Sequence, residues 1–484
     1  MADSRQASGL QIRRMQRVVE SQTRAIYFLS SILLSLLLTY FIREPDFTPP
    51  QVYVLFLLFF AIFLWVSEAI PPFAVGIMIV GFLVFFLGNP IVKTDYQIEV
   101  MAFVNTWSDS VIWLLLGGFF LAEAMKKTEL DRALFKLSSA RFGKTAKYFL
   151  LGQMLSTAIA SMFISNTATT AMMFVAIMPL LKKEGGDPNL SKALVLGIPG
   201  AAAIGGMGTI IGSPTNAIAV DMINNLPNST YELGFLEWMY FGLPVAILLI
   251  LVLWFALLQK YPLKEETVDV ASLLADLPTE KPEEELDYSP KEKNLRKRIV
   301  LIILGITVLL WLTDKIHPIP IAAVSGIPII GLTMLSIITN EDVRKLPWDT
   351  LMLVAGGLSL GLAIQETGLS QQFVDMIKGF DMNALFLIVI FAIATVFFSN
   401  IMSNTATVTI MVPAASLMPG VDTIQLALVI GLCASCALFL PVSTPPNAIA
   451  YSTGLVKQSQ FRLGGMLIGL GGPILIILWV LLVL

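Results

Sequence analysis

Two long stretches of this chain, residues 148–181 and 382–421, contain no charged side chain. The first is 34 residues long, and a single α-helix of that length would extend over about 51 Å. The hydrocarbon core of a lipid bilayer is only about 30 Å thick. Each stretch is therefore predicted to form a re-entrant hairpin, in which two shorter helices enter the membrane and leave it on the same side.

The rest of the chain has the composition of an integral membrane protein. Hydrophobic residues make up 56% and charged residues 13% of the 484 residues, and the apolar residues run in blocks long enough to cross a bilayer. No basic patch interleaved with aromatic residues indicates binding to nucleic acid. The only histidine is His317, which excludes a multi-histidine metal site and a histidine-based catalytic relay. We expect an all-α membrane protein with about eleven transmembrane helices and two re-entrant hairpins.

A short polar string, Ser-Asn-Thr-Ala-Thr, occurs once in each uncharged stretch, at 165–169 and at 403–407. Each string is followed by a polar segment with a proline, Gly-Ser-Pro-Thr-Asn at 212–216 and Ser-Thr-Pro-Pro-Asn at 443–447. Proline interrupts a helix, and irregular backbone at membrane depth is tolerated only where it is buried in protein or lines a cavity. The four segments are predicted to form one binding site, with the two strings at the hairpin tips.

Several landmarks recur in the same order in the two halves of the chain, which indicates an internal duplication. The paired landmarks, at offsets of 231 to 239 residues, are Gly117-Gly118 with Gly356-Gly357, Thr128-Glu129-Leu130 with Thr367-Gly368-Leu369, Asn166 with Asn404, and Asn216 with Asn447. The predicted parts are a cytoplasmic N-terminal arm with the first transmembrane helix (1–50), a first repeat with a cytoplasmic-side hairpin (51–259), a cytoplasmic linker (260–298) and a second repeat with an outer-side hairpin (299–484).

The distribution of positive charge predicts the orientation in the membrane. If both uncharged stretches are hairpins, the N-terminus is cytoplasmic, the C-terminus is outside, and 27 of the 31 Lys and Arg residues lie on the cytoplasmic side. If each stretch crossed once, 13 of these residues would move outside, against the positive-inside rule. An odd number of spans separates equivalent landmarks, so the repeats are predicted to have inverted topology. We expect a multi-pass protein of the plasma (cell inner) membrane.

The residue types in the four polar segments indicate which ions they would bind. Neutral hydroxyl, amide and carbonyl oxygens suit a weakly held monovalent cation, and the absence of Asp and Glu argues against a dedicated calcium or magnesium site. Backbone N–H groups and the positive ends of half-helices suit an anion. None of the segments contains Lys or Arg. An anionic substrate would therefore be held by hydroxyls, amides, helix ends and bound cations, which would couple the anion to the cation.

At these residues the sequence resembles the divalent-anion/sodium symporter (DASS) family, the INDY-like carriers of dicarboxylates, citrate and sulfate. The resemblance rests on the doubled Ser-Asn-Thr and on the Thr-Pro-Pro-Asn at 444–447, and it covers nearly all of the chain after the N-terminal arm. It implies a secondary active transporter coupled to sodium, with C4-dicarboxylates such as succinate as the expected substrates. It also implies a homodimer in the lipid bilayer, in which the part that carries the hairpins moves like an elevator.

The resemblance also implies roles for individual residues. The first sodium site would be formed by Ser161, Ser165, Asn166 and the carbonyl of Gly212, and the second by Ser399, Asn404 and the carbonyl of Ser443. The substrate carboxylates would meet Asn166, Thr167, Asn404, Thr405 and Pro445. The Ser-Pro-Thr-Asn at 213–216 departs from the Thr-Pro-Pro-Asn that the family often has, so the first half of the site matches less closely.

Several alternatives stay open from the residues alone. Sodium-independent exchange of dicarboxylates would use the same motifs, and citrate or sulfate could be the substrate. One Ser-Asn-Thr would indicate hydrogen bonding between helices, but two copies, each paired with a proline-broken span, indicate binding. A membrane enzyme is not favoured because no catalytic pair of side chains is apparent within the membrane, and a channel is not favoured because inverted repeats with broken helices are typical of alternating access. Cys433 and Cys436, in an uncharged segment, are interpreted as helix-packing residues.

Overall fold

The computed structural model describes residues 2–88, 99–142, 145–181, 187–225, 232–263, 267–268, 289–377, 383–418 and 420–484, and only the backbone of residues 2–21, 131–132, 374 and 376–377. Most of the predicted linker, 260–298, lies outside the described residues. All regular structure in the described ranges is helical, which confirms the predicted all-α class.

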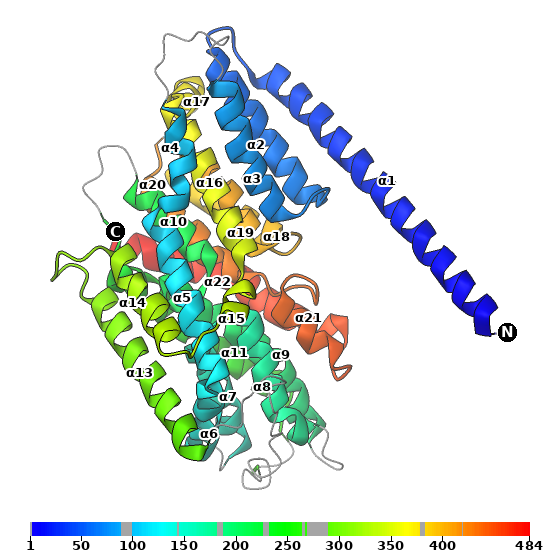
Figure 1. Ribbon diagram of the computed structural model, residues 1–484, viewed down its shortest axis with the longest axis vertical. Helices are drawn as coiled ribbons and strands as arrows, with labels where there is room; N and C mark the ends of the chain where they lie inside the picture. Colours follow the sequence, from blue (N-terminus) through cyan, green and yellow to red (C-terminus); the bar gives the residue numbers. More distant parts are fainter. Residues whose placement is uncertain are drawn as a thin grey trace. The chain divides into compact units, whose positions relative to one another are not determined.

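The helices follow the order of the predicted spans and hairpins (Figure 1). In the first half they are α1 (Ala2–Ile42), α2 (Pro49–Ser67), α3 (Pro72–Leu87), α4 (Val100–Asn105), α5 (Ser110–Lys127), α6 (Leu130–Phe142), α7 (Ala146–Ser161), α8 (Asn166–Leu181), α9 (Pro188–Gly205), α10 (Pro214–Asn224) and α11 (Phe235–Lys260). In the second half they are α13 (Pro290–Leu312), α14 (Ile321–Met334), α15 (Asn340–Arg344), α16 (Trp348–Glu366), α17 (Leu369–Ile377), α18 (Ala384–Ser399), α19 (Asn404–Ala415), α20 (Thr423–Cys433), α21 (Pro445–Ser452) and α22 (Phe461–Val483).

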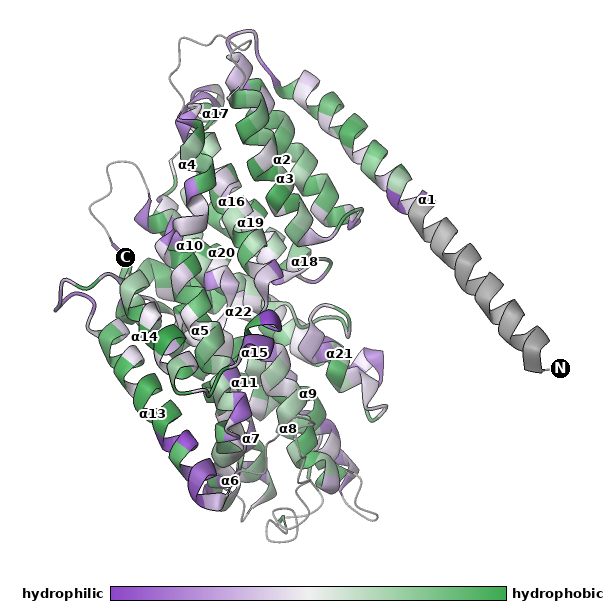
Figure 2. Ribbon diagram, viewed as in Figure 1, coloured by the Kyte–Doolittle hydropathy of each residue, from purple (hydrophilic) through white to green (hydrophobic). Residues whose placement is uncertain are grey.

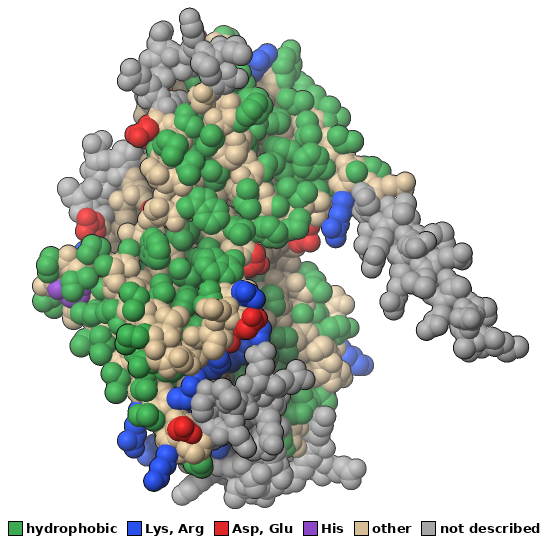
Figure 3. Space-filling model, in the orientation of Figure 1, with side chains coloured by type: hydrophobic (Ala, Val, Ile, Leu, Met, Phe, Trp, Pro, Cys, Tyr) green, Lys and Arg blue, Asp and Glu red, His purple; other side chains and the backbone are tan. Residues whose placement is uncertain are grey.

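Several helices have the length and hydropathy needed to cross a membrane. Within the described ranges, seven helical segments qualify, namely 22–42, 49–67, 100–127, 188–208, 235–260, 348–366 and 458–483. Figure 2 shows that apolar residues dominate helices such as α2 and α3, and that α13 is hydrophilic at one end and apolar beyond it. On the face seen in Figure 3, hydrophobic side chains predominate and charged ones gather in small groups. These features agree with a multi-pass membrane protein, whereas the count of eleven spans stays a prediction.

The contacts divide the chain into two compact units, and each unit contains segments of both repeats. One unit comprises 1–107, 352–380 and 416–419, and the other comprises 108–351, 381–415 and 420–484. In the first unit α2 packs against both α1 and α3. The second unit contains both hairpins and both proline-containing segments.

Each uncharged stretch forms two helices joined by a short turn, as the absence of charge predicted. In the first stretch α7 and α8 have 16 residues each and meet at the turn 162–165. In the second stretch α18 has 16 residues, α19 has 12, and they meet at the turn 400–403. A 16-residue helix is about 24 Å long, which is shorter than a hydrocarbon core of about 30 Å. The two arms of each hairpin pack against each other.

The two proline-containing segments interrupt helices where the sequence predicted a break. After α9, the backbone forms 3₁₀ turns at Gly206–Gly208 and Ile210–Gly212 before α10 begins at Pro214. After α20, it forms a 3₁₀ turn at Ala434–Cys436 and runs irregularly to the start of α21 at Pro445. Proline fits the first turn of a helix, where its missing N–H has no intrahelical role.

The paired glycines lie where a helix of one repeat packs closely on a helix of the other. In α5, a Cβ placed on Gly117 would lie 2.9 Å from Ser325 Cβ of α14. In α16, a Cβ placed on Gly356 would lie 2.2 Å from Gly76 Cα of α3. The two repeats thus exchange partners at this contact: α5 packs on the second-repeat helix α14, and α16 packs on the first-repeat helix α3.

A second pair of landmarks has the same local structure in both repeats. The Thr128 hydroxyl donates to the Ala124 carbonyl and the Thr367 hydroxyl to the Ala363 carbonyl, both at 2.7 Å. The residue that follows has a left-handed backbone in each case, with φ 52° at Glu129 and 69° at Gly368. We call 128–129 the α5–α6 junction and 367–368 the α16–α17 junction. Their shared geometry supports the duplication.

Replacing Gly368 with alanine is expected to lower the free energy of unfolding by about 1 to 2 kcal/mol, because an L-residue is strained at this φ. A Cβ at Gly368 would meet only Gln51 Nε2, at 3.7 Å, so a clash would not explain the loss. The matched control is Gly305→Ala in α13, where a Cβ would meet nothing within 4 Å and stability should hold or rise slightly. Thermal unfolding of the detergent-solubilised protein measures both. Equal effects would contradict the backbone explanation.

Candidate functional site

The two Ser-Asn-Thr strings lie at the hairpin tips, where α8 and α19 begin. Ser165 and Ser403 precede these helices and cap them. The Ala168 N–H donates to Ser165 Oγ at 3.3 Å, and the Ala406 N–H donates to Ser403 Oγ at 3.1 Å. Serine is favoured at this position because its hydroxyl pairs with an N–H that has no intrahelical partner. The asparagine and threonine that follow each serine are therefore held in the first turn of a half-helix.

Three oxygens converge at the tip of the first hairpin. Ser161, at the end of α7, is fully buried. Its Oγ lies 2.5 Å from Asn166 Oδ1 and 2.8 Å from the Ala202 carbonyl oxygen of α9. One hydroxyl proton cannot serve both acceptors fully. A group of neutral oxygens that exceeds its donors is the kind of environment that suits a monovalent cation.

Gly206, in the broken helix after α9, allows the backbone to approach Asn166 closely. A Cβ placed on Gly206 would lie 2.8 Å from Asn166 Oδ1 and 3.1 Å from the Gly212 carbonyl oxygen. The Asn166 side chain and the Gly212 carbonyl therefore both lie next to Gly206. The structure thus brings together Ser161, Asn166 and Gly212, three of the residues that the sequence assigned to the first cation site. The fourth, Ser165, uses its hydroxyl to cap α8.

The second hairpin tip carries two oxygens without partners. Ser399 is fully buried and Asn404 is half-buried. Ser399 Oγ and Asn404 Oδ1 are shielded from solvent, and neither has a hydrogen-bond partner in the described part of the chain. Leaving a buried polar atom unpaired costs about 1 to 3 kcal/mol. Both arms of this hairpin pack against the 3₁₀ turn at Ala434–Cys436, so a cation held at the tip would lie beside the second broken helix.

Asn400, to which the sequence pattern assigned no role, links the second hairpin tip to the segment that follows the second break. Asn400 Oδ1 accepts hydrogen bonds from the Phe439 N–H and from the Ser443 hydroxyl, both at 2.9 Å. Its Nδ2 donates to the Val396 carbonyl at 2.8 Å. Asn400 therefore ties the second hairpin tip to the segment that carries Ser443. An asparagine in an otherwise apolar, uncharged stretch needs such partners, and that signal could have identified it.

Buried asparagines satisfy the backbone where the helices are broken. Asn216 Nδ2 donates to the Thr209 carbonyl and Asn447 Nδ2 to the Leu440 carbonyl, at 2.8 and 3.0 Å. In each repeat the acceptor is seven residues before the asparagine. Carbonyls in a broken helix lack helical partners, and burying them unpaired is costly. The last asparagine of each predicted segment thus has a structural role that the two repeats share.

Helices of one repeat that carry polar segments pack on helices of the other repeat that carry them. Helix α10, which follows the first break, packs against α19 of the second hairpin, and α21, which follows the second break, packs against α8 of the first. All of these elements belong to one compact unit. Thr167 and Pro445 are exposed, whereas Asn166, Asn404 and Thr405 are half-buried. The side chains assigned to substrate thus reach the surface, and the fully buried Ser161 and Ser399 lie behind them.

The electrostatics of these segments come from dipoles. Four half-helices begin at the polar segments, namely α8, α10, α19 and α21. Helix N-termini carry partial positive charge and unpaired N–H groups, which favour anions. Among the described residues, no group of three or more His, Cys, Asp or Glu could hold a metal ion. The arrangement can hold a weakly bound cation on neutral oxygens and an anion on helix ends and amides.

The cysteine pair lies outside this arrangement of ligands. Cys433 and Cys436 are buried and are not joined by a disulfide. A Cβ placed on Gly472 of α22 would lie 2.7 Å from Cys436 Sγ. This close approach agrees with the interpretation of Cys436 as a helix-packing residue.

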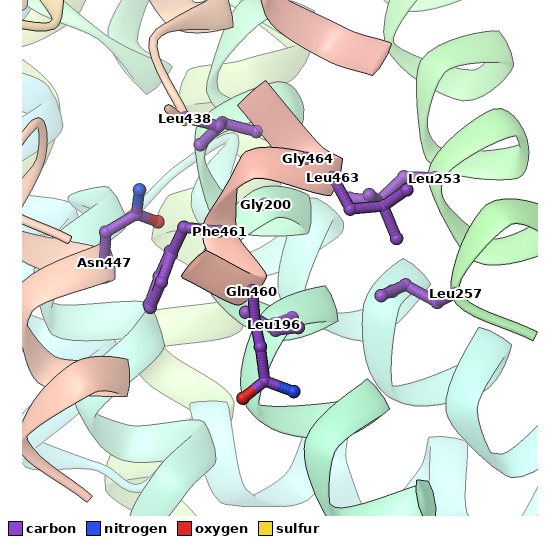
Figure 4. Close-up of a pocket in the computed structure, with 10 residues that line it drawn as sticks. All are labelled: Leu196, Gly200, Leu253, Leu257, Leu438, Asn447, Gln460, Phe461, Leu463 and Gly464. Carbon is purple, nitrogen blue, oxygen red and sulfur yellow. The ribbon is translucent and has the colours of Figure 1, made fainter. Parts of the chain in front are cut away.

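A small cavity lies beside Asn447 but does not provide room for a substrate (Figure 4). Its volume is about 20 Å³, which accommodates about one water molecule. Leucine, glycine and phenylalanine form most of its lining, and the amides of Asn447 and Gln460 are the polar groups among the ten lining residues. The cavity belongs to the packing between α9, α11, α21 and α22.

Replacing Gly206 with alanine is expected to reduce transport at least about 10-fold, since the added methyl would push Asn166 Oδ1 and the Gly212 carbonyl apart. The contact distances of 2.8 and 3.1 Å leave no space for it. The matched control is Gly326→Ala in α14, where a Cβ would meet nothing within 4 Å. Uptake per folded protein measures both variants. Normal uptake by Gly206→Ala would show that this convergence of oxygens does not serve transport.

Sequence comparisons identify relatives over most of the chain. The sequence profile described as "Citrate transporter" (CitMHS) matches residues 62–421. An "uncharacterized transporter" of Haemophilus influenzae is 32% identical over 93% of this chain and 95% of its own length. The sodium-dependent dicarboxylate transporter SdcS of Staphylococcus aureus is 30% identical over 92% of this chain and 88% of its own length.

Two solved structures are similar in fold. MtrF of Neisseria gonorrhoeae, described among antimetabolite efflux pumps, has a TM-score of 0.51 with 12% identity, covering 85% of this chain and 94% of its own. The YdaH transporter of Alcanivorax borkumensis has a TM-score of 0.53 with 9% identity, covering 85% of this chain and 97% of its own. At such low identity these likenesses concern the fold alone.

The profile match covers more than half of the chain, and the relative from H. influenzae aligns over nearly all of it. The family predicted from the doubled Ser-Asn-Thr motif is thereby confirmed. The relatives over most of the chain are described as transporters. The chain belongs to the citrate transporter family and is a multi-pass membrane transporter.

Proposed function

We propose that this chain is a secondary active transporter that couples sodium to the movement of C4-dicarboxylates such as succinate. The observation that carries the proposal is the pair of solvent-shielded, unpaired oxygens Ser399 Oγ and Asn404 Oδ1 at the second hairpin tip. A sodium ion would satisfy both oxygens without requiring a carboxylate ligand. The name of the S. aureus relative, a sodium-dependent dicarboxylate transporter, supports the same ion and the same substrate class.

The proposed sodium sites follow the two repeats. The first would use the side chains of Ser161 and Asn166 with the Gly212 carbonyl, and Ser165 would contribute only if its hydroxyl also turned from the α8 cap. The second would use Ser399, Asn404 and the Ser443 carbonyl. Because all these ligands are neutral, each site would bind sodium weakly and release it readily.

The proposed substrate site uses one polar string from each repeat. A dicarboxylate has two similar anionic ends. Asn166 and Thr167 at the start of α8 would receive one carboxylate, and Asn404 and Thr405 at the start of α19 the other. The exposed ring of Pro445 would contact the carbon chain between them. Two sodium ions close to these residues would offset the charge of a divalent anion.

The remaining parts of the proposal concern movement and assembly. We infer that the repeats have inverted topology, with the N-terminus cytoplasmic and the C-terminus outside the plasma membrane. The transporter would work as a homodimer, and the part that carries the hairpins would move like an elevator between the two sides of the membrane. The packing of α10 on α19 and of α21 on α8 supports this proposal, because it connects the helices that carry the two strings, so that they could move together.

Uptake of labelled succinate into proteoliposomes tests the proposal. We expect uptake to require an inward sodium gradient and to fall when sodium is replaced by potassium. Because an ion that binds with the substrate raises its affinity reciprocally, lowering sodium should also raise the apparent KM for succinate. Competition by citrate and by sulfate would rank the substrates.

Sodium-independent exchange is the second candidate function, and one observation favours it. In the first repeat, the Ser161 hydroxyl donates to Asn166 Oδ1 at 2.5 Å, so this pair is hydrogen-bonded within the protein, unlike Ser399 Oγ and Asn404 Oδ1. If Ser399 Oγ and Asn404 Oδ1 formed the equivalent hydrogen bond in the second repeat, neither tip would need sodium. Uptake that requires internal dicarboxylate and ignores sodium would establish exchange and overturn sodium coupling.

A further inference from the structure

The α5–α6 and α16–α17 junctions share one backbone turn but are held in different ways. At the α16–α17 junction, the Gln51 amide Nε2 of α2 donates to the Thr367 carbonyl at 3.1 Å. This contact is neutral, and Gly368 takes the left-handed backbone without strain. At the α5–α6 junction the left-handed residue is Glu129, and its carboxylate pairs with Lys297. The two equivalent junctions are therefore stabilised by different kinds of contact, a neutral hydrogen bond in one and ion pairs in the other.

An ion pair lies at the end of α5, directly before the α5–α6 junction. Lys127 Nζ, from the last residue of α5, lies 2.6 Å from Asp342 Oδ2 of α15. The exposed fractions of the two side chains are 29% and 7%. The same oxygen, Asp342 Oδ2, accepts from the Thr339 N–H and from the Thr339 hydroxyl, both at 2.7 Å. The carboxylate is thus fixed by the start of its own helix and is presented to the end of α5.

A second, weaker pair involves Glu129, two residues after Lys127. Lys297 Nζ of α13 is 3.7 Å from Glu129 Oε2, and both side chains are about one-third exposed, at 31% and 39%. Partly exposed pairs at this separation contribute little. The Lys127–Asp342 pair therefore holds the junction, and the Glu129–Lys297 pair adds to it.

The packing on either side shows what the junction connects. Before it, α5 packs against α13 and α14. After it, α6 packs against α7 and α8, the hairpin that carries Asn166 and Thr167. Any displacement of this hairpin relative to α5 would have to be taken up at Thr128 and Glu129, or by bending α6.

We propose that the Lys127–Asp342 ion pair is a latch on the α5–α6 junction, and that these two residues are positioning residues that set how fast the first hairpin moves during transport. Only the effect of the latch on transport rests on the proposed function. Its effect on the junction itself can be measured without substrate. At the α16–α17 junction, by contrast, the contact from Gln51 is neutral and the left-handed residue is a glycine.

The protonation of Asp342 is consistent with a latch that stays closed at neutral pH. Burial raises the pKa of Asp342, but the hydrogen bonds from Lys127 and Thr339 lower it, and the net pKa is below its usual value. A lowered pKa means that this contribution is fully present above the ordinary aspartate pKa of about 4. It is lost only as the pH falls through the lowered pKa.

Hydrogen–deuterium exchange of the full-length protein tests the latch directly. In Asp342→Asn and in Lys127→Met, the amides of residues 128–133 should exchange about fivefold faster or more. The amides of residues 367–372 provide a control within the same molecule, because Ala133 N–H donates to the Glu129 carbonyl and Gln372 N–H to the Gly368 carbonyl, both at 3.2 Å. Their exchange should not change. Lys127→Arg, which keeps the positive charge, should retain the slow exchange of the wild type.

The transport assay then connects the latch to function. Both neutral variants should change the maximal rate of succinate uptake several-fold while the KM stays within about twofold, because neither residue belongs to the substrate site.

The outcomes separate the two proposals. Unchanged exchange at 128–133 in both neutral variants would overturn the latch, and equal acceleration at 367–372 would show general destabilisation and overturn it too. Altered exchange with an unchanged maximal rate would overturn its role in transport. If the wild-type protein moves no dicarboxylate while the exchange results are as expected, the proposed function fails and the latch stands.

Discussion

Replacing Asn404 with alanine is expected to abolish dicarboxylate transport or to weaken substrate affinity by roughly 5- to 150-fold, with the folded protein intact. An asparagine side chain has one carbonyl oxygen and two N–H donors, so it can face a cation and an anion together. Its loss would remove both contacts and leave polar groups at the hairpin tip unpaired, at a cost of about 1 to 3 kcal/mol. Asn166→Ala should have the same consequence in the first repeat. Sodium-dependent uptake of labelled succinate measures both.

Three variants serve as controls for this prediction. Thr167→Ala and Thr405→Ala remove only a hydroxyl and should raise the apparent KM more mildly. Ser435→Ala should be nearly silent, because Ser435 lies outside both strings and, like its small neighbours, is interpreted as a residue of helix packing. If both asparagine variants transport at wild-type rates and affinities, the two strings serve helix packing instead.

Replacing Gly356 with valine is expected to have the largest effect on folding. Even a Cβ at this position would lie 2.2 Å from Gly76 Cα and 2.5 Å from the Gly76 carbonyl oxygen. Both atoms belong to the backbone, so no side chain can rotate away, and α16 and α3 would have to separate. Overpacking a tight interior usually costs about 1 to 3 kcal/mol, and a clash between two backbones should exceed this range.

The yield of folded protein and its thermal unfolding midpoint measure this effect. The matched control is Gly471→Val in α22, where a Cβ would meet nothing within 4 Å. We expect Gly356→Val to yield little folded protein and Gly471→Val to behave like the wild type. Comparable yields of the two variants would show that α3 and α16 can adjust their spacing.

The features that the sequence predicted well are those with a local cause. The absence of charge in 148–181 and 382–421, together with their length, was enough to predict two helices and a turn in each. Pro214 and Pro445, each preceded by short polar residues, predicted the broken helices, and each begins the helix that follows the break. Thr128 and Thr367 are as far apart in the sequence as Gly117 and Gly356, which pointed to a duplication. Both threonines make the same hydrogen bond, to the carbonyl four residues earlier.

The features that the sequence did not predict depend on residues distant in the chain. In the sequence Asn400 is one polar residue in an uncharged stretch, and only the structure shows that the Phe439 N–H and the Ser443 hydroxyl donate to it. Lys127 and Asp342 are separated by 215 residues, and no spacing rule pairs them. The predicted ligand Ser165 is a helix cap in this structure, because one serine pattern suits a cap and a cation site equally.

The exchange of partners between the repeats has a consequence for biosynthesis. The glycine face of α5 packs on α14, and the string-bearing helix α8 packs on α21. A ribosome adds about 5 to 20 residues per second, so the roughly 200 residues between α5 and α14 take on the order of 10 to 40 seconds to make. During that time the first half would lie in the membrane with these surfaces unmatched. Neither half should be stable alone, whereas two halves produced in the same cell could assemble.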